Sequence, residues 1–395
     1  MAVPLSAHQV RLLRQRAQRL DAPQPDAAAG AAQVARVVHA LGGVQAQYEV
    51  AAALTIRART AGLVAADVER ERVDARSVVR TWCQRSTLHL LAAEDMCWLL
   101  PLVGPVFPRA SRRRLALGLD AETAARGVRA LRAALAEQGP LTRAELVEHL
   151  KRRGLRLEGQ AAPHLLAYAA LQGVVCCGPD RRGTPTYALL DDWLPGWAHR
   201  GPPLPREAAL AELARRYLAA YGPAAPEDLA AWSGLPFGEA RAAWRQIAGE
   251  LLEVDAAGQP AWLPTHRGPW LDEVDPLTGQ EERPPAPAVV RLVAGYDPYL
   301  LGYRHRDLAV APEHARHVHP GGGLLHPTLL VDGRALGTWR TQQRRARLEV
   351  VVQPFGALAA GVRRRLEAEA TDVDRFLGMP AALCAAAPQR SGAAG

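Results

Sequence analysis

Lysine is nearly absent from this sequence: Lys151 is the only lysine among 48 lysine and arginine residues. Cysteine is scarce as well, and an odd number of cysteines without a C-x-x-C pair argues against a disulfide framework and against a zinc site. There is no run of about 18 apolar residues that could span a membrane and no signal-peptide pattern at the N-terminus. We therefore expect a reduced, soluble, cytoplasmic protein. The cysteines are Cys83, Cys97, Cys176, Cys177 and Cys384.

Length and charge narrow the architecture and the partner. The 395 residues are enough for two to four domains. A formal net charge of +8 and a pI of about 9.6 favour an anionic partner. Arginine supplies this charge, and its planar fork binds phosphate through two hydrogen bonds. A GC-rich genome would produce the same excess of arginine, so composition alone leaves both explanations open.

Residues 41–48 form the most informative stretch. A predicted helix ends there at Gly42 and Gly43, because glycine readily adopts the left-handed conformation that stops a helix. The residues that follow alternate between apolar and polar, so Gln45 and Gln47 point to one face of an extended segment. Each carboxamide offers an acceptor and a donor, and the pair could hold a water or a polar substrate group. Alternatively, the amides merely satisfy backbone groups after the helix end.

Two helices followed by a β-hairpin are predicted three times along the chain, which is the pattern of a winged helix. The first hairpin is expected over residues 77–91. In the second unit a helix begins at Thr142, where Glu145 completes a capping box. We expect the three units to span residues 1–120, 121–203 and 204–285.

The C-terminal third has a different character. Residues 275–287 are rich in proline and charge and are predicted to be a domain boundary. Beyond them the chain is β-rich, with a hairpin turn at Asp332-Gly333 and a disordered tail after Pro388. The predicted strands are 288–293, 328–331, 335–338 and 347–353, and the predicted helices are 357–370 and 372–377.

Five motifs occur in order along the chain: Gly43-Val44-Gln45-Ala46-Gln47, Arg80 to Leu90, Tyr296 to Arg304, Pro320-Gly321-Gly322-Gly323 and Gly337-Thr338-Trp339-Arg340. Each is weak alone, but the ordered set resembles the winged-helix DNA glycosylase family typified by AlkZ and YcaQ. The resemblance implies an α+β fold of three tandem winged-helix units followed by a C-terminal β-barrel-like domain, here residues 286–395. These parts would surround a positively charged channel for DNA.

The resemblance also implies a function. The family excises alkylated purines from double-stranded DNA and unhooks interstrand crosslinks made by natural products of the azinomycin type. Its catalytic signature is Gln-x-Gln or Gln-x-Asp, which in this chain is Gln45-Ala46-Gln47, the form of the AlkZ-like branch. A hairpin of the C-terminal domain enters the DNA near the lesion, and residues 325–338 are the candidate. We expect no metal, no other cofactor and a monomer; general repair and self-resistance both stay open.

Two glutamines suit this reaction. An N7-alkylated guanine is cationic, so it leaves as a neutral base without a strong acid catalyst. An amide is a poor general base, but it positions water and turns its carbonyl dipole toward a developing oxocarbenium ion. A glycosylase that also cleaves the strand needs an amine for a Schiff base, and only Lys151 and the N-terminus could supply one. We therefore predict a monofunctional glycosylase that leaves an intact abasic site.

Other side chains are candidates for supporting roles. Asp297 and Glu49 could assist water activation. Tyr299, Tyr303 and Trp339 could stack on bases, although core packing is favoured for at least two of these rings. The candidates for DNA binding are Arg85, Arg304, Arg306, His319, Arg334 and Arg340.

Four histidines lie near the glycine-rich turn at 320–323. A metal site would need ligands at fixed spacing and a carboxylate or thiol partner, so DNA contact or simple loop polarity is favoured over metal binding. The four are His314, His317, His319 and His326.

A non-catalytic winged-helix transcription regulator is the alternative function, because tandem winged helices bind DNA more often than they cleave glycosidic bonds. A regulator would favour dimerisation on a palindromic site, yet no dimerisation coiled coil is evident. Gln45 and Gln47 also lie outside the interior of a recognition helix, which favours the enzyme. An inactive member of the enzyme lineage is a third alternative.

Overall fold

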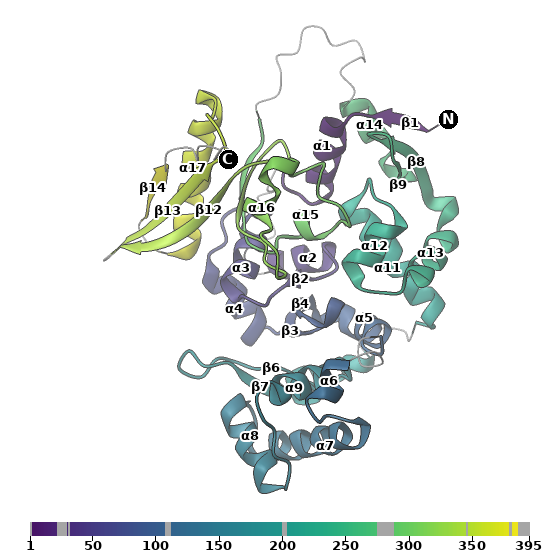
Figure 1. The fold of residues 1–395 in the computed structure, drawn as a ribbon, viewed down its shortest axis with the longest axis vertical. Coiled ribbons are helices and arrows are strands. Elements are labelled where there is room, and N and C mark those ends of the chain that lie inside the picture. The colour runs from purple at the N-terminus through teal and green to yellow at the C-terminus, as the bar shows by residue number, and fades with distance from the viewer. Residues whose placement is uncertain are drawn as a thin grey trace, which may run out of the picture.

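The computed structural model describes residues 2–21, 30, 32–106, 112–199, 204–274, 288–344, 347–378 and 381–385. These residues form three sheets of three strands and one sheet of five, with helices packed around them (Figure 1). None of the described helices has the length and apolar character that a bilayer crossing requires. The predicted boundary at 275–287 and the tail after Pro388 lie outside the described residues.

The Gln-x-Gln segment of the first unit begins on the edge strand of its sheet, which ends at Gln45. Its strand order is β2–β4–β3, and β3 and β4 form the hairpin predicted over residues 77–91. The prediction missed two of the helices before this hairpin. The elements are α2 (Ala32–Ala40), β2 (Val44–Gln45), α3 (Glu49–Arg57), α4 (Ala65–Val73), β3 (Val78–Trp82) and β4 (Leu88–Ala92), followed by α5 (Met96–Val103).

The end of α2 requires glycine. Gly42 and Gly43 have φ angles of 66° and 113°, in the left-handed region that favours glycine. A Cβ atom on Gly43 would lie 2.9 Å from the side chain of Leu91 on β4. The predicted helix stop is therefore confirmed, and it turns the chain directly into β2.

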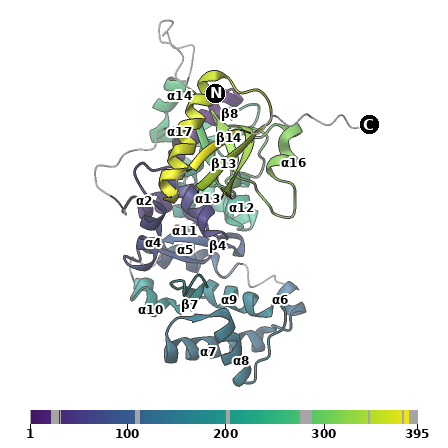
Figure 2. The ribbon, with the colours of Figure 1, turned by 90° about the vertical axis from the view of Figure 1, so that its left-hand side faces the viewer.

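The second unit occupies one end of the molecule (Figures 1 and 2). The capping box is confirmed, since the Glu145 amide donates to Thr142 Oγ1 at 3.3 Å and the Thr142 amide to Glu145 Oε2 at 2.7 Å. A long helix, α7, was not predicted because much of its buried face is alanine and glycine, which weakens the apolar periodicity in the sequence. The elements are α6 (Arg112–Ala116), α7 (Ala121–Gln138), β5 (Leu141–Thr142), α8 (Arg143–Arg152), α9 (Ala161–Leu171), β6 (Val175–Cys177), β7 (Thr186–Leu189) and α10 (Leu190–Trp193).

The third unit includes the N-terminus of the chain. Strand β1 pairs in parallel with β8, and the helix that follows starts at the capping residue Ser6. Otherwise the unit has the predicted order of helices followed by a hairpin. The elements are β1 (Val3–Leu5), α1 (Ala7–Ala17), α11 (Arg206–Tyr221), α12 (Pro226–Ser233), α13 (Phe237–Gln246), β8 (Leu251–Ala256), β9 (Pro260–Pro264) and α14 (Pro269–Val274).

The C-terminal region is built on a five-stranded sheet of order β10–β11–β12–β13–β14. In the described residues this sheet is open, with β10 and β14 at its edges, and α17 packs on it (Figure 2). The turn at Asp332-Gly333 is confirmed, with φ angles of 47° and 72°. The elements are β10 (Val290–Val293), α15 (Pro298–Leu301), α16 (Ala315–Val318), β11 (Thr328–Val331), β12 (Arg334–Arg344), β13 (Arg347–Pro354), α17 (Ala360–Leu377) and β14 (Ala381–Ala385).

The expectation of two helices at 357–370 and 372–377 is wrong, because α17 runs through without a break. No glycine or proline lies between residues 362 and 377. Asp372, which resembled a helix start, instead lies within α17 and accepts hydrogen bonds from Arg375 and from Arg57 of α3.

The first unit and the C-terminal sheet share one hydrophobic core. Val34 and Ile56 from the first unit pack in the same cluster as Leu292, Trp339 and Phe376. Polar contacts reinforce the junction, since the buried Arg57 donates to the Leu292 carbonyl at 2.8 Å. The C-terminal sheet is therefore fixed next to the helices that flank the Gln-x-Gln segment.

Candidate active site

The Gln-x-Gln segment continues the sheet of the first unit. Gln45 is paired with His89 of β4, and the Ala46 amide donates to the Leu88 carbonyl at 2.7 Å. Ala46 is buried, whereas Gln45 is half-buried and Gln47 is exposed. Burial alternates along the segment as predicted, with the apolar residues in the core and the carboxamides outside it, while the strand itself ends at Gln45.

Arg80 fixes the backbone of this segment from the inside. Its side chain is buried, and its Nε donates to the Ala46 carbonyl at 3.0 Å. The same guanidinium forms an ion pair with Glu49 at the start of α3. Glu49, a candidate for water activation, is thereby engaged by Arg80, and the chain between Ala46 and α3 is held at both ends.

Arg85 determines the orientation of the Gln45 amide. Its Nη2 donates to Gln45 Oε1 at 3.1 Å, and its Nη1 donates to the Trp232 carbonyl of α12 in the third unit. A guanidinium only donates, so the Gln45 atom that faces it must be the oxygen. The Gln45 NH2 group is therefore the end that stays available to a ligand. Burial lowers the pKa of Arg85 from its usual value.

His89, the strand neighbour of Gln45, is neutral in the folded protein. Burial, and then the charge of Arg85, lower the pKa of its imidazole to about 3. Its Nδ1 lies 2.9 Å from the Thr87 carbonyl, which can only accept, so Nδ1 carries the proton. Close by, burial raises the pKa of Cys83 to about 12, and its thiol is not a nucleophile at neutral pH.

Asp297 is a structural carboxylate. It is fully buried, and its two oxygens accept hydrogen bonds from Arg59 at 2.7 and 2.9 Å. The three rings considered for base stacking are also in the core. Tyr299 donates to the Gly333 carbonyl, Tyr303 to the Tyr221 carbonyl and Trp339 to the Val293 carbonyl.

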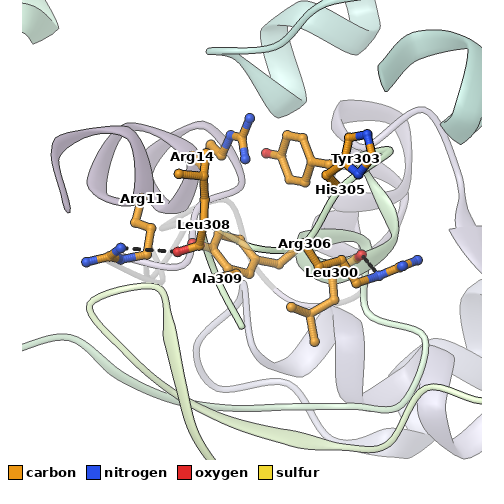
Figure 3. Close-up of a pocket in the computed structure, with 9 residues that line it drawn as sticks. Arg11, Arg14, Leu300, Tyr303, His305, Arg306, Leu308 and Ala309 are labelled. Carbon is orange, nitrogen blue, oxygen red and sulfur yellow. Dashed lines mark hydrogen bonds between the residues drawn. The ribbon is translucent and has the colours of Figure 1, made fainter. Parts of the chain in front are cut away.

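The candidates for DNA binding lie on different elements. Arg85 contacts Gln45, as described above. Arg304, Arg334 and Arg340 are exposed, and His319 is half-buried. Figure 3 shows Arg306 beside a small cavity, where its Nε donates to the Leu300 carbonyl at 2.8 Å.

The histidine cluster packs around Phe355. The His314 ring stacks on Phe355 with centroids 4.2 Å apart, and the His317 ring lies 5.5 Å from it. His326 Nδ1 lies 2.9 Å from the His317 carbonyl. Among the described residues, no group of three or more His, Cys, Asp or Glu side chains could hold a metal ion.

Arg80 and His89 received no role in the sequence analysis, although both lie in the motif from Arg80 to Leu90. The signal that could have identified them is strand register: Arg80 is opposite Leu90, and Thr81 and Gln45 flank His89. That register depends on the pairing of β2 with β4, which cannot be inferred from the local sequence.

Comparison with known proteins places this geometry in context. A family model described as "DNA glycosylase AlkZ-like" matches residues 38–376. The interstrand DNA cross-link repair glycosylase of Streptomyces sahachiroi is 32% identical over 362 residues, which covers 87% of this chain and 90% of that protein. The solved structure of Streptomyces sahachiroi DNA glycosylase AlkZ matches with a TM-score of 0.78 and 27% sequence identity, covering 97% of this chain and 100% of that chain.

Proposed function

This chain belongs to the AlkZ-like DNA glycosylase family and hydrolyses N-glycosyl bonds in DNA, and on that premise we propose that its lesions are N7-alkylated purines, including those joined in interstrand crosslinks. The family membership agrees with the motifs in the sequence and disfavours a non-catalytic regulator. The name of the Streptomyces sahachiroi relative, an interstrand cross-link repair glycosylase, supports the extension to crosslinks.

In this proposal, Gln45 and Gln47 are the catalytic pair, and they act differently. Gln45 Oε1 is occupied by Arg85, so Gln45 acts through its NH2 group as a donor to the departing purine or to the attacking water. Gln47 is exposed, and its carbonyl orients the water and faces the positive charge that develops on the sugar. The orientation imposed on Gln45 by Arg85 is the observation that carries this proposal.

The remaining parts of the molecule would hold the DNA. We take the three helix-and-hairpin units to be winged helices that contact the duplex as a monomer. Their expected boundaries are 1–120, 121–203 and 204–285, except that β1 and α1 belong with the third unit and α6 with the second. The exposed Arg304, Arg334 and Arg340 would contact phosphates, with the hairpin at 325–338 near the lesion. The half-buried Arg306 and His319 would supply further contacts.

The product of this reaction would be an intact abasic site. Lys151 lies on α8, in the unit at one end of the molecule, whereas β2 lies near the middle of Figure 1. Its amine is 3.8 Å from Glu148 on the same helix. This placement supports hydrolysis by water rather than attack by an amine.

The test uses four duplexes with the purified protein: one with N7-methylguanine, one with an azinomycin-type crosslink, one with hypoxanthine as a neutral base, and one unmodified. We expect strand breaks at the cationic lesion and unhooking of the crosslink, with strand breaks visible only after alkali. The hypoxanthine and unmodified duplexes should stay intact. Excision of hypoxanthine at a similar rate, or strand cleavage without alkali, would contradict the proposal.

A further inference from the structure

An aromatic pair lies directly beside the Gln-x-Gln segment. Tyr48 follows Gln47 in the chain and is 56% exposed, an unusual position for a large ring. Its ring stacks on that of Tyr296, with centroids 5.7 Å apart and an angle of 23° between the planes. Tyr48 precedes α3 of the first unit and Tyr296 follows β10, so the pair bridges two parts of the fold that are distant in sequence.

The turn that carries Tyr296 is held firmly. Tyr296 has a φ angle of 62°, which a bulky residue rarely adopts and which persists only where the surroundings impose it. The next residue, Asp297, is fully buried in its ion pair with Arg59. The residue before, Gly295, is so close to the chain that a Cβ atom would lie 2.9 Å from the Leu325 carbonyl. These contacts fix the direction of the Tyr296 ring.

Tyr296 is the inner ring of the pair and Tyr48 is the outer, solvent-exposed ring. Tyr296 packs against the buried cluster that contains Tyr299, Leu300 and Leu325. Tyr48 packs on Tyr296 and presents more than half of its surface to solvent. The tyrosine ring has an electron-rich face, which stacks on nucleobases of any sequence and attracts cations.

We propose that Tyr48, supported by Tyr296, is a stacking platform for the alkylated purine itself. An N7-alkylated purine carries a positive charge, so it gains a cation–π attraction that an unmodified purine lacks. The platform is exposed rather than enclosed, and a base that is tethered to the opposite strand can reach it without passing into a deep pocket. This inference rests on the proposed function, because that function supplies the cationic base.

The test measures binding without catalysis. A 2′-fluoro sugar blocks departure of N7-methylguanine, so the dissociation constants of a 2′-fluoro-N7-methylguanine duplex and of the matched guanine duplex can be compared. Wild type and Tyr48→Phe should bind the methylated duplex more tightly than the guanine duplex. In Tyr48→Ala the ratio of the two dissociation constants should change about tenfold toward equality, which is within the range measured for stacking and cation–π contacts. Val50→Ala, two residues away and 59% exposed, is the matched control and should bind as wild type does.

The outcomes separate the two proposals. Equal preference in wild type and Tyr48→Ala would overturn the platform, and so would the absence of any preference in wild type. Thermal melting of each variant shows that the exposed substitution leaves the fold intact. If wild type fails to excise N7-methylguanine from an unfluorinated duplex while the Tyr48-dependent preference holds, the platform stands and the proposed function fails.

Discussion

Single side chains decide which chemical groups the Gln-x-Gln segment presents. Arginine has only donors, so the contact between Arg85 and Gln45 fixes the amide with its oxygen inward. Donation to that oxygen also polarises the amide and strengthens its N–H groups as donors. His89, next to Gln45 in the sheet, stays neutral and adds no further positive charge beside the Gln-x-Gln segment.

The neutral state of His89 has a consequence for stability. Its folded pKa of about 3 is below the unfolded value of about 6.5. Between these values the unfolded chain binds one more proton than the folded chain. The contribution of neutral His89 to stability is therefore fully present above about pH 6.5. Below about pH 6.5, and down to about pH 3, the free energy of unfolding falls by about 1.4 kcal/mol for each unit that the pH decreases.

His89→Asn is expected to remove this part of the pH dependence. The asparagine amide can replace Nδ1 as the donor to the Thr87 carbonyl, and it does not titrate. Urea denaturation of both proteins between about pH 4.5 and 7 measures the effect. The curve of the variant should be flatter than that of wild type, and identical slopes would show that His89 does not titrate between the two states.

The sequence singled out Gln45 and Gln47 as the candidate pair. Their alternation with apolar residues is a local pattern, and the ordered motifs resemble those of a known family. The roles of Arg80, Arg85 and Tyr48 were not found, because each depends on a partner at least 30 residues away in the chain. Arg85 was a candidate for DNA binding, and its contact with Gln45 from a tight turn was not foreseen.

At the scale of elements, a buried ion pair joins the segment after α3 to the turn after β10. Arg59 and Asp297 are both fully buried in side-chain atoms, and Arg59 also donates to Gln18 at 3.0 Å and to the Thr55 carbonyl at 2.9 Å. The pair ties the first unit to the C-terminal region. It also fixes the turn that carries Tyr296.

Asp297→Asn should destabilise the protein by about 3–5 kcal/mol, because it leaves the buried Arg59 without a charged partner. The matched control is Glu137→Gln, which breaks an ion pair with Arg153 in which Glu137 is 57% exposed. The control should cost less than about 1 kcal/mol. Urea denaturation compares the two variants, and equal losses would contradict the role assigned to the buried pair.

The elements were predicted well where local signals are strong and poorly where pairing is distant. The three hairpins, the glycine stop after α2 and the cap at Thr142 all follow from local residue types. Strands β1 and β14 were missed because both are short and join sheets whose other strands lie elsewhere in the chain. The break expected in α17 is absent because Asp372 accepts a hydrogen bond from Arg57 instead of capping a new helix.

At the scale of the whole molecule, several parts converge on the Gln-x-Gln segment. The third unit reaches it through Tyr221, which donates to the Leu41 carbonyl at 3.1 Å, and through Trp232, which accepts from Arg85. The C-terminal region reaches it through the shared core and through Tyr296. An α+β chain of this arrangement, similar over its length to the AlkZ structure, thus places both amides where its parts meet.

The most direct test of the central claim is the single-turnover rate of N7-methylguanine excision at saturating enzyme. We predict that Gln45→Ala and Gln47→Ala each lose about 10²- to 10³-fold, as for loss of one oriented donor in other enzymes. Gln45→Glu should fold, because its carboxylate still accepts from Arg85, but it should lose as much rate as Gln45→Ala because it has no NH2 group. A double variant, Gln45→Ala with Gln47→Ala, that excised the base at the wild-type rate would contradict the account.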